Sequence, residues 1–218
     1  MAQDGVIKFQ MQHTPAAALP WDQLAELNAW RKILVLLECI GQTPARYDNI
    51  GFGNISCRIG NTVGSDDSKP NQRCFAITGT QTGGVADLKA EHYVTVTACY
   101  PSQNKIVSEG PLKPSSESMT HGTIYAIDKR IRWVMHGHCV PIWHNAEKLG
   151  IPLTDGSVPY GSPEMAGEVR RLFRESDVRK LKIFAMGGHD DGIVTFGRTA
   201  EEAGQVLLNW LAKSLLIT

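Results

Sequence analysis

Three histidines in two places are the residues best suited to chemistry in this chain. His136 and His138 flank a glycine at the end of an apolar run, and His189 lies further along in the segment Met-Gly-Gly-His-Asp-Asp-Gly. The β-branched and aromatic residues around His136 predict a strand, whose side chains alternate between faces. His136 and His138 would then point the same way, with Cα atoms about 6.5 Å apart. Two imidazoles at that separation can hold one divalent ion at about 2.0–2.1 Å, and a third would leave one coordination position open for catalysis.

The plainer interpretation of these histidines stays open on spacing alone, because residues at i and i+2 can simply be core or hydrogen-bonding side chains. Cys139 adjoins His138 but would point to the opposite strand face, so we do not expect it to be a ligand. Five cysteines are scattered without any CxxC pair, which favours reduced thiols over a disulfide framework or a thiolate zinc site.

Composition favours a small-molecule partner. The chain has 218 residues, 42% of them hydrophobic, which is enough for one large domain. Lys plus Arg and Asp plus Glu both number 22, so no net charge favours nucleic acid or an anionic membrane surface. The sequence has no apolar stretch of transmembrane length and no secretory signal pattern, and we expect a cytoplasmic protein.

Local patterns predict helices arranged around strands. Residues 1–20 contain two prolines and small side chains, and are expected to form an irregular N-terminal arm. Apolar residues from Trp21 onward follow helical spacing up to Gly41, which supplies a left-handed end. Short extended runs bounded by turn residues then predict strands of a largely antiparallel sheet: Asn54–Ile59, Cys74–Thr78, His92–Thr97 and Lys105–Ser108.

The second half of the chain continues this alternation. A helix should begin near Ser115 or Ser116, either of which is a good N-cap, and the histidine strand follows it. Thr199 predicts the start of a final helix, with Glu201 and Glu202 in its first turn. The other expected elements are helices at Trp143–Leu149 and Ser162–Phe173 and strands at Lys182–Met186 and Ile193–Phe196. Together these elements predict α/β layering.

Five short motifs in order carry a family resemblance. They are Gly53-Asn-Ile-Ser-Cys-Arg58, Ile77-Thr-Gly-Thr-Gln-Thr-Gly83, Pro114-Ser-Ser-Glu117, His136-Gly-His138 and His189. In this order and spacing the chain resembles the class II aldolase and adducin head-domain family, which includes fuculose-phosphate aldolase and ribulose-phosphate 4-epimerase. The resemblance runs from about Trp21 to Leu215. Each motif alone arises easily by chance, whereas five in order are specific.

The resemblance implies a fold and an activity. It implies a single class II aldolase-like domain over residues 21–218, built as a three-layer α/β/α sandwich around a central, mainly antiparallel sheet. It implies Zn²⁺, or Mn²⁺ or Co²⁺, held by His136, His138 and His189, with Glu117 as the catalytic carboxylate. Three neutral ligands leave the ion most of its charge, so it can polarise a substrate carbonyl. The expected reaction is cleavage or formation of a C–C bond in a small ketose phosphate through a metal-stabilised enediolate.

Phosphate binding is implied for four further residues, namely Asn54, Thr80, Ser115 and Ser116. They offer hydroxyl, amide and backbone donors, in part near a predicted helix N-terminus. The alternative for these residues is ordinary turn and capping chemistry. Glu117 has an alternative too, since an acid at a helix N-terminus is favoured by the helix dipole. His121 lies four residues after Glu117 and can share its helical face, where a supporting or structural role is favoured over ligation.

Two departures from the family pattern keep other activities open. His189 is followed by Asp190-Asp191-Gly192, first of all a tight turn, where the family usually has His-Gly. The short connection from Leu149 to Val158 lacks the tyrosine that acts as acid/base from a neighbouring subunit in fuculose-phosphate aldolase. An epimerase or dehydratase of a sugar phosphate could use the same site. A non-catalytic adducin-like scaffold is a further alternative, although such heads lack the ligand histidines. The family typically forms homotetramers, which we expect here.

Overall fold

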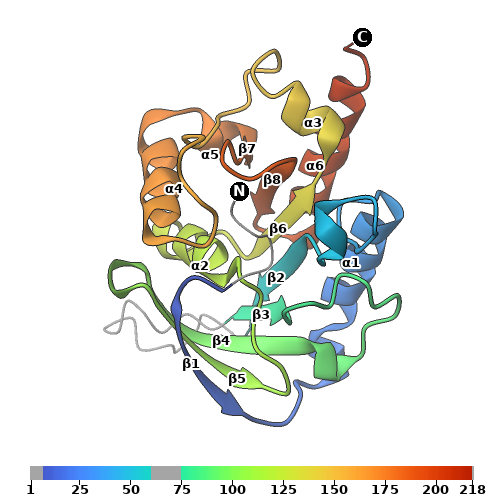
Figure 1. Ribbon diagram of the computed structural model, residues 1–218, viewed down its shortest axis with the longest axis vertical. Helices are drawn as coiled ribbons and strands as arrows, with labels where there is room; N and C mark the ends of the chain where they lie inside the picture. Colours follow the sequence, from blue (N-terminus) through green and yellow to red (C-terminus); the bar gives the residue numbers. More distant parts are fainter. Residues whose placement is uncertain (1–6, 60–74, 218) are drawn as a thin grey trace.

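The computed structural model describes residues 7–59 and 75–217. Its centre is a sheet of eight strands in the order β1-β5-β4-β3-β2-β6-β8-β7 (Figure 1). β1 and β5 run parallel, and the other neighbouring strands are antiparallel. The strands are β1 Gln10–Pro15, β2 Asn54–Arg58, β3 Phe75–Thr78, β4 Tyr93–Tyr100, β5 Lys105–Gly110, β6 Trp133–His138, β7 Ile183–Ala185 and β8 Gly192–Gly197. The sheet is thus mainly antiparallel, as predicted.

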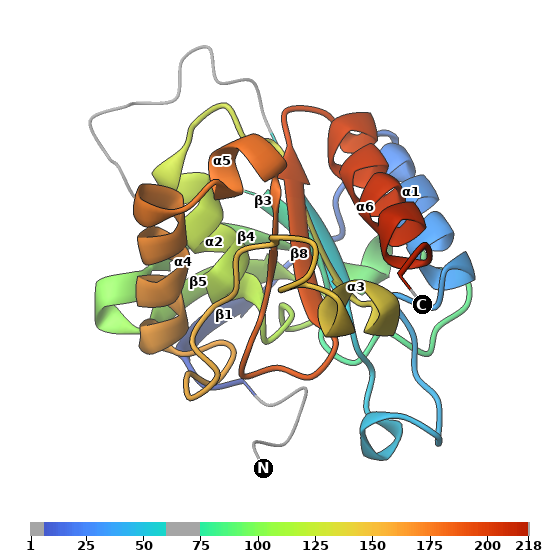
Figure 2. The same ribbon diagram turned by 90° about the horizontal axis from the view of Figure 1, so that it is seen from above.

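Helices cover both faces of the sheet, which gives the predicted three-layer α/β/α sandwich. Figure 2 shows α2 and α4 on one side of the strands and α1, α3 and α6 on the other. The helices are α1 Ala25–Leu36, α2 Ser118–Ile127, α3 Val140–His144, α4 Pro163–Glu175, α5 Val178–Leu181 and α6 Ala200–Ser214, with short 3₁₀ turns at Trp21–Gln23, Tyr47–Asn49, Ala90–His92 and Pro101–Gln103. No helix in the described part of the chain is long and apolar enough to cross a membrane.

The strand period divides the core into two clusters. Along β6, Val134 belongs to the cluster under α2 and α4, whereas Trp133 and Met135 belong to the cluster under α1 and α6. All six β6 residues are buried, because helices cover both faces. Each fully buried large apolar side chain contributes about 1.5–3 kcal/mol relative to an exposed one, so β6 is firmly held on both sides. The same alternation directs His136 and His138 to the α2 side.

The expectation of an irregular arm at residues 1–20 has to be corrected for Gln10–Pro15. This segment is β1, paired in parallel with β5. Phe9, immediately before the strand, is buried in the α2-side cluster, and Asn104 binds the backbone on both sides of Phe9. The tertiary anchor, rather than local propensity, makes this segment a strand.

The first long helix ends earlier than the sequence predicts. α1 stops at Leu36, and Glu38 rather than Gly41 takes a left-handed conformation, with φ of 56°. Gly41 instead forms a β-bridge with Phe52, where an added Cβ would lie 3.1 Å from the Phe52 ring. The loop between α1 and β2 is therefore folded back on itself. The predicted strand start at Cys74 lies outside the described residues.

The final two long helices begin at the residues that the sequence predicts, and in each the N-cap side chain binds the first turn. Thr199 Oγ1 accepts a hydrogen bond from Glu202 N at 3.0 Å, and Ser162 Oγ accepts one from Met165 N at 3.1 Å. The outer edge of β7 is occupied by the preceding chain: Ala185 N donates to Pro152 O at 2.9 Å, and Thr154 N donates to Ala185 O at 3.0 Å.

Candidate metal centre

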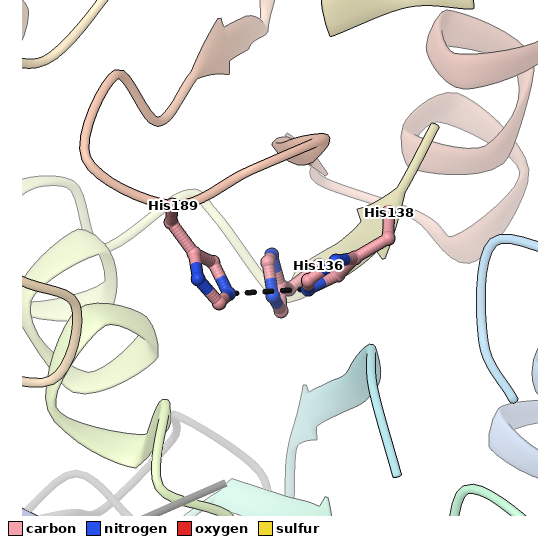
Figure 3. Close-up of side chains that lie close together, drawn as sticks. All are labelled: His136, His138 and His189. Carbon is pink, nitrogen blue, oxygen red and sulfur yellow. Dashed lines mark hydrogen bonds between the residues drawn. The ribbon is translucent and has the colours of Figure 1, made fainter. Parts of the chain in front are cut away.

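Sheet order brings the three predicted ligands together. β2 and β8 both run antiparallel to β6, so the start of each lies beside the end of β6. In this register Asn54 pairs with His136, and Gly192 pairs with His138. His189 precedes Gly192 by one tight turn, in which Gly192 N donates to His189 O at 2.9 Å. Figure 3 shows the resulting group, with the three imidazoles turned toward one another.

The distances suit a divalent ion. The Nε2 atoms of His138 and His189 are 3.1 Å apart, and one ligand atom from each of the three histidines lies within 4.8 Å of the others. Two nitrogens bound tetrahedrally at about 2.0–2.1 Å from one ion would be about 3.3–3.4 Å apart. The three side chains are only 1%, 2% and 6% exposed. A borderline ion such as Zn²⁺ therefore fits this donor set.

The protonation states also suit metal binding. Burial lowers the pKa of His136 to about 4, although its hydrogen bond to Ile193 O opposes the shift. Burial likewise holds the pKa values of His138 and His189 well below the usual range. The rings are thus neutral near pH 7, as metal ligands must be. His136 Nδ1 donates to Ile193 O at 3.1 Å, which leaves Nε2 as its ligand atom.

Glu117 is the N-cap residue of α2, so the expectation of Ser115 or Ser116 at that position is corrected by one or two residues. The residue is buried, with 2% of its surface exposed. Ser115 Oγ accepts from Glu117 N at 3.3 Å, and Ser118 Oγ donates to Ser115 O at 2.6 Å. These bonds tighten the turn before α2 and thereby fix where Glu117 begins the helix.

One hollow contains all eight predicted site residues. It is lined by Gly51, Phe52, Gly53, Asn54, Gly79, Thr80, Gln81, Thr82, Gly83, Ser115, Ser116, Glu117, His136, His138 and His189. The hollow thus joins the histidine cluster to three loops with small or hydroxyl-bearing residues. Gly53 illustrates why a residue without a side chain is needed in one of these loops. Its φ is 72°, and a Cβ there would lie 2.6 Å from Cys39 O. The Oδ1 atom of Asn54 is buried without a partner among the described residues, which leaves an acceptor for a ligand.

A comparison with protein families gives one match: the Class II Aldolase and Adducin N-terminal domain family, over residues 44–210. The chain belongs to this family. The family resemblance stated from the sequence motifs is thereby confirmed.

Solved structures support the same class II aldolase fold. L-fuculose-1-phosphate aldolase from Thermus thermophilus is 18% identical, with 91% of this chain and 93% of that chain covered and a TM-score of 0.62. A sugar-phosphate aldolase from Thermotoga maritima is 15% identical over 90% and 93%, with a TM-score of 0.63. YgbL from Klebsiella pneumoniae, a putative aldolase/epimerase/decarboxylase, is 17% identical over 90% and 88%, with a TM-score of 0.61. A comparison with curated protein sequences finds no significant match.

The departure of this class II aldolase-family chain at the third ligand has a structural counterpart. Asp191, with φ of 61°, sits in the predicted tight turn, and its carboxylate accepts from Tyr47 OH at 2.6 Å. Arg46 donates to Tyr47 OH at 2.8 Å and to His138 O at 3.3 Å. The Tyr47 ring lies edge-on to His138, with centroids 4.6 Å apart. The sequence did not predict these contacts around His138, because Tyr47 and Asp191 are far apart in the chain.

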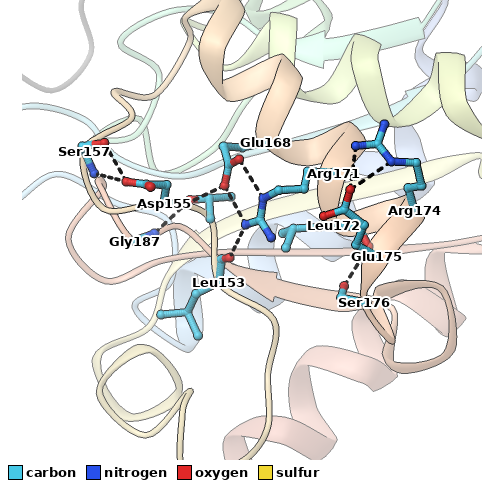
Figure 4. Close-up of polar contacts among 11 residues, drawn as sticks. Leu153, Asp155, Ser157, Glu168, Arg171, Leu172, Arg174, Glu175, Ser176 and Gly187 are labelled. Carbon is cyan, nitrogen blue, oxygen red and sulfur yellow. Dashed lines mark hydrogen bonds and ion pairs between the residues drawn. The ribbon is translucent and has the colours of Figure 1, made fainter.

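A second set of contacts packs against His189 on the α4 side of the sheet. The Tyr160 ring packs on His189 with centroids 4.6 Å apart, and Lys8 Nζ lies 3.6 Å from the Tyr160 centroid. The loop before Tyr160 is tied to α4, where Glu168 accepts from Arg171 and from Asp155 N (Figure 4). Thr154 Oγ1 accepts from Gly187 N at 3.0 Å, which joins that loop to the His189 segment. Tyr160, expected to be structural, packs directly against a candidate ligand.

Cys139 pairs with Cys39 and is not one of the ligands, although the expected strand position is not observed, because β6 ends at His138 and Cys139 precedes α3. The hydrogen bond between the two thiols, together with burial, raises the pKa of Cys39. Among residues 7–59 and 75–217, only the three histidines form a group that could hold a metal.

A separate hollow of about 100 Å³ lies at the opposite ends of β6 and β8. Two ion pairs line it, Asp128 with Arg130 and Lys182 with Glu202.

Proposed function

We propose that this chain is a metal-dependent lyase of the class II aldolase type that cleaves or forms a C–C bond in a small ketose phosphate. The observation that carries the proposal is the shared hollow: three neutral imidazoles, one buried carboxylate and several hydroxyl and amide groups line the same space. The divalent ion that His136, His138 and His189 would hold supplies Lewis acidity toward a substrate carbonyl.

Glu117 is proposed as the proton-transfer residue. It lines the hollow with the histidines, and its backbone is fixed by the Ser115 turn and the first turn of α2. A carboxylate in this position can take a proton from, or return one to, the carbon beside the substrate carbonyl. Its near-complete burial excludes water from competing for that proton.

The remaining predicted residues are proposed to bind substrate oxygens. Ser115, Ser116 and Thr80 carry hydroxyl groups around the hollow, and the Asn54 amide adds a donor and an acceptor. Hydroxyl and amide donors can hold a phosphate through several hydrogen bonds, while the buried Oδ1 of Asn54 can accept from a substrate hydroxyl. A phosphorylated polyol thus matches both kinds of group.

The test combines metal analysis with a product assay. Protein purified without chelator should contain about one divalent ion per chain, and it should release dihydroxyacetone phosphate from at least one member of a panel of ketose 1-phosphates. Glu117→Gln should keep the ion and lose at least about 100-fold in rate, the lower range for a general acid–base residue. His136→Ala should lose the ion, whereas the exposed His144→Ala is the matched control and should keep both.

Other outcomes identify the other members of this reaction class. Metal without dihydroxyacetone phosphate release, but with Glu117-dependent isomerisation or water loss, would replace the aldolase with an epimerase or a dehydratase. Absence of bound metal and of all these activities would overturn the enzymatic proposal in favour of a scaffold.

A further inference from the structure

A buried hydrogen-bond chain lies behind the proposed catalytic carboxylate. His121, in α2, is 0% exposed, and its Nδ1 lies 2.6 Å from Ser56 Oγ on β2. Ser56 Oγ is also 2.8 Å from Tyr125 OH, one helical turn further along α2. None of these three side chains lines the hollow, and the roles proposed above do not use them.

The other ring nitrogen of His121 has no partner among the described residues. Its Nε2 atom is buried, and no described group accepts from it or donates to it. A buried polar atom without a partner costs about 1–3 kcal/mol by general mutational experience, so its retention calls for a ligand or a functional partner. Burial, with a smaller contribution from nearby His136, holds the pKa of His121 well below the usual range, so the ring is neutral.

Helix geometry directs Nε2 toward Glu117. Side chains at i and i+4 lie on the same helix face, so Glu117, His121 and Tyr125 form one row. Nδ1 of His121 meets Ser56 together with Tyr125, at the far end of that row. The opposite edge of the ring, which carries Nε2, therefore faces the Glu117 end.

The direction of the chain follows from the acceptor. A carboxylate that is to take a proton starts ionised, and an ionised carboxylate only accepts hydrogen bonds. The imidazole facing it must then carry its proton on Nε2, which leaves Nδ1 to accept from the Ser56 hydroxyl. Tyr125 OH lies 2.8 Å from Ser56 Oγ and 3.3 Å from Arg132 O, and Arg132 O already accepts from Arg58 N at 2.8 Å. Tyr125 OH therefore donates to Ser56 Oγ. In this arrangement the hydroxyl protons of Ser56 and Tyr125 each have an acceptor.

We propose that His121 is a positioning residue for Glu117. Ser56 and Tyr125 hold it in the Nε2–H tautomer, and the Nε2–H group, which makes no hydrogen bond in this structure, donates to the carboxylate when a ligand occupies the hollow. This inference rests on the proposed proton transfer by Glu117. It differs from a core role because it requires a defined tautomer and a donor at one end of the ring.

Two amide substitutions separate the ends of the imidazole. His121→Gln keeps an N–H donor near the position of Nε2, whereas His121→Asn keeps only a group near Nδ1. We expect His121→Asn to lower kcat about 10- to 100-fold with little change in KM, as for other residues that orient a catalytic group. His121→Gln should recover most of that loss. Equal loss in both variants, with metal content unchanged, would overturn the proposal.

A measurement independent of turnover separates this inference from the proposed activity. In ¹⁵N NMR spectra of the metal-loaded chain, the ring signals absent from His121→Gln should show a proton on Nε2 and none on Nδ1. Ser56→Ala should weaken that preference. A proton on Nδ1 would overturn the inference even if the chain proves to be an aldolase. The Nε2–H tautomer in a chain without lyase activity would instead overturn only the proposed reaction.

Discussion

Replacing the buried Arg31 with methionine should lower the free energy of unfolding far more than replacing an exposed charged residue. Arg31 lies in α1 and is 0% exposed. Its guanidinium donates to Thr82 O at 2.9 Å and to Val85 O at 2.8 Å, with longer contacts to the carbonyls of Gly83 and Ala86. Burial lowers the pKa of this group, but a guanidinium remains charged at any relevant pH. The loop it holds also carries Thr80 into the hollow.

The magnitude follows from the two short bonds. A hydrogen bond from a charged donor contributes about 1.5–3 kcal/mol, and the two loop carbonyls would lose their donor inside the protein. We expect Arg31→Met, which keeps the apolar volume, to lower the free energy of unfolding by about 3–5 kcal/mol. With a urea m-value of about 2 kcal/mol/M, the midpoint should fall by about 1.5–2.5 M.

The neighbouring lysine supplies a matched control. Lys32 contacts the same loop through Asp87 at 2.8 Å, but the two side chains are 51% and 80% exposed. An exposed ion pair contributes little, so Lys32→Met should leave the urea midpoint close to that of the unchanged chain. Urea unfolding followed by tryptophan fluorescence measures both. Similar midpoints for the two variants would refute the idea that the buried carbonyl contacts, rather than charge, hold this loop.

Two further predictions concern helix packing and pH. Gly204→Ala in α6 should destabilise by about 1–3 kcal/mol, because a Cβ would lie 1.9 Å from Trp30 Cζ3. Gly167→Ala in α4, where a Cβ meets nothing within 4 Å, should stabilise by about 0.5–1 kcal/mol; thermal unfolding of the pair checks the sign of each change. Hydrogen bonds from Arg130 lower the pKa of Asp128 to about 2, below the unfolded value of about 3.9. The ionised carboxylate thus stabilises the fold above pH 4 and loses this effect as pH falls toward 2, so Asp128→Asn should cost about 1 kcal/mol at pH 7 after screening. Urea titrations at pH 7 and pH 2.5 should show that cost shrinking, and a constant difference would contradict the pKa argument.

The histidine cluster was accessible from the sequence because its information is local. Strand alternation alone places His136 and His138 on one face, and the ordered motifs supply His189 and Glu117. The catalytic and ligand roles of these residues stay predictions until metal content and turnover are measured. Capping by Thr199 was equally local, since its side chain binds a backbone N–H three residues ahead.

The supporting contacts could not be predicted, because sheet topology decides them. Tyr47 meets Asp191 across 144 residues, and Arg31 meets Thr82 across 51. β1 was missed for the same reason: its sequence is mostly polar and ends in a proline, and Phe9 and Asn104 hold it against β5. Gly41 was expected to end a helix, but its close contact with Phe52 explains why that position is a glycine.

The covering of β7 by residues 152–154 has a consequence for how copies of this chain can meet. Open strand edges invite pairing with a second molecule and, in the unfavourable case, aggregation. Ala185, at this edge, already bonds the chain through both its N–H and its carbonyl, and β7 spans only Ile183–Ala185. At the other border, β1 ends in Pro15, which lacks an N–H to offer. Growth of the sheet from one subunit into the next is therefore opposed at β7, whereas at β1 only the last residue lacks an N–H group to donate.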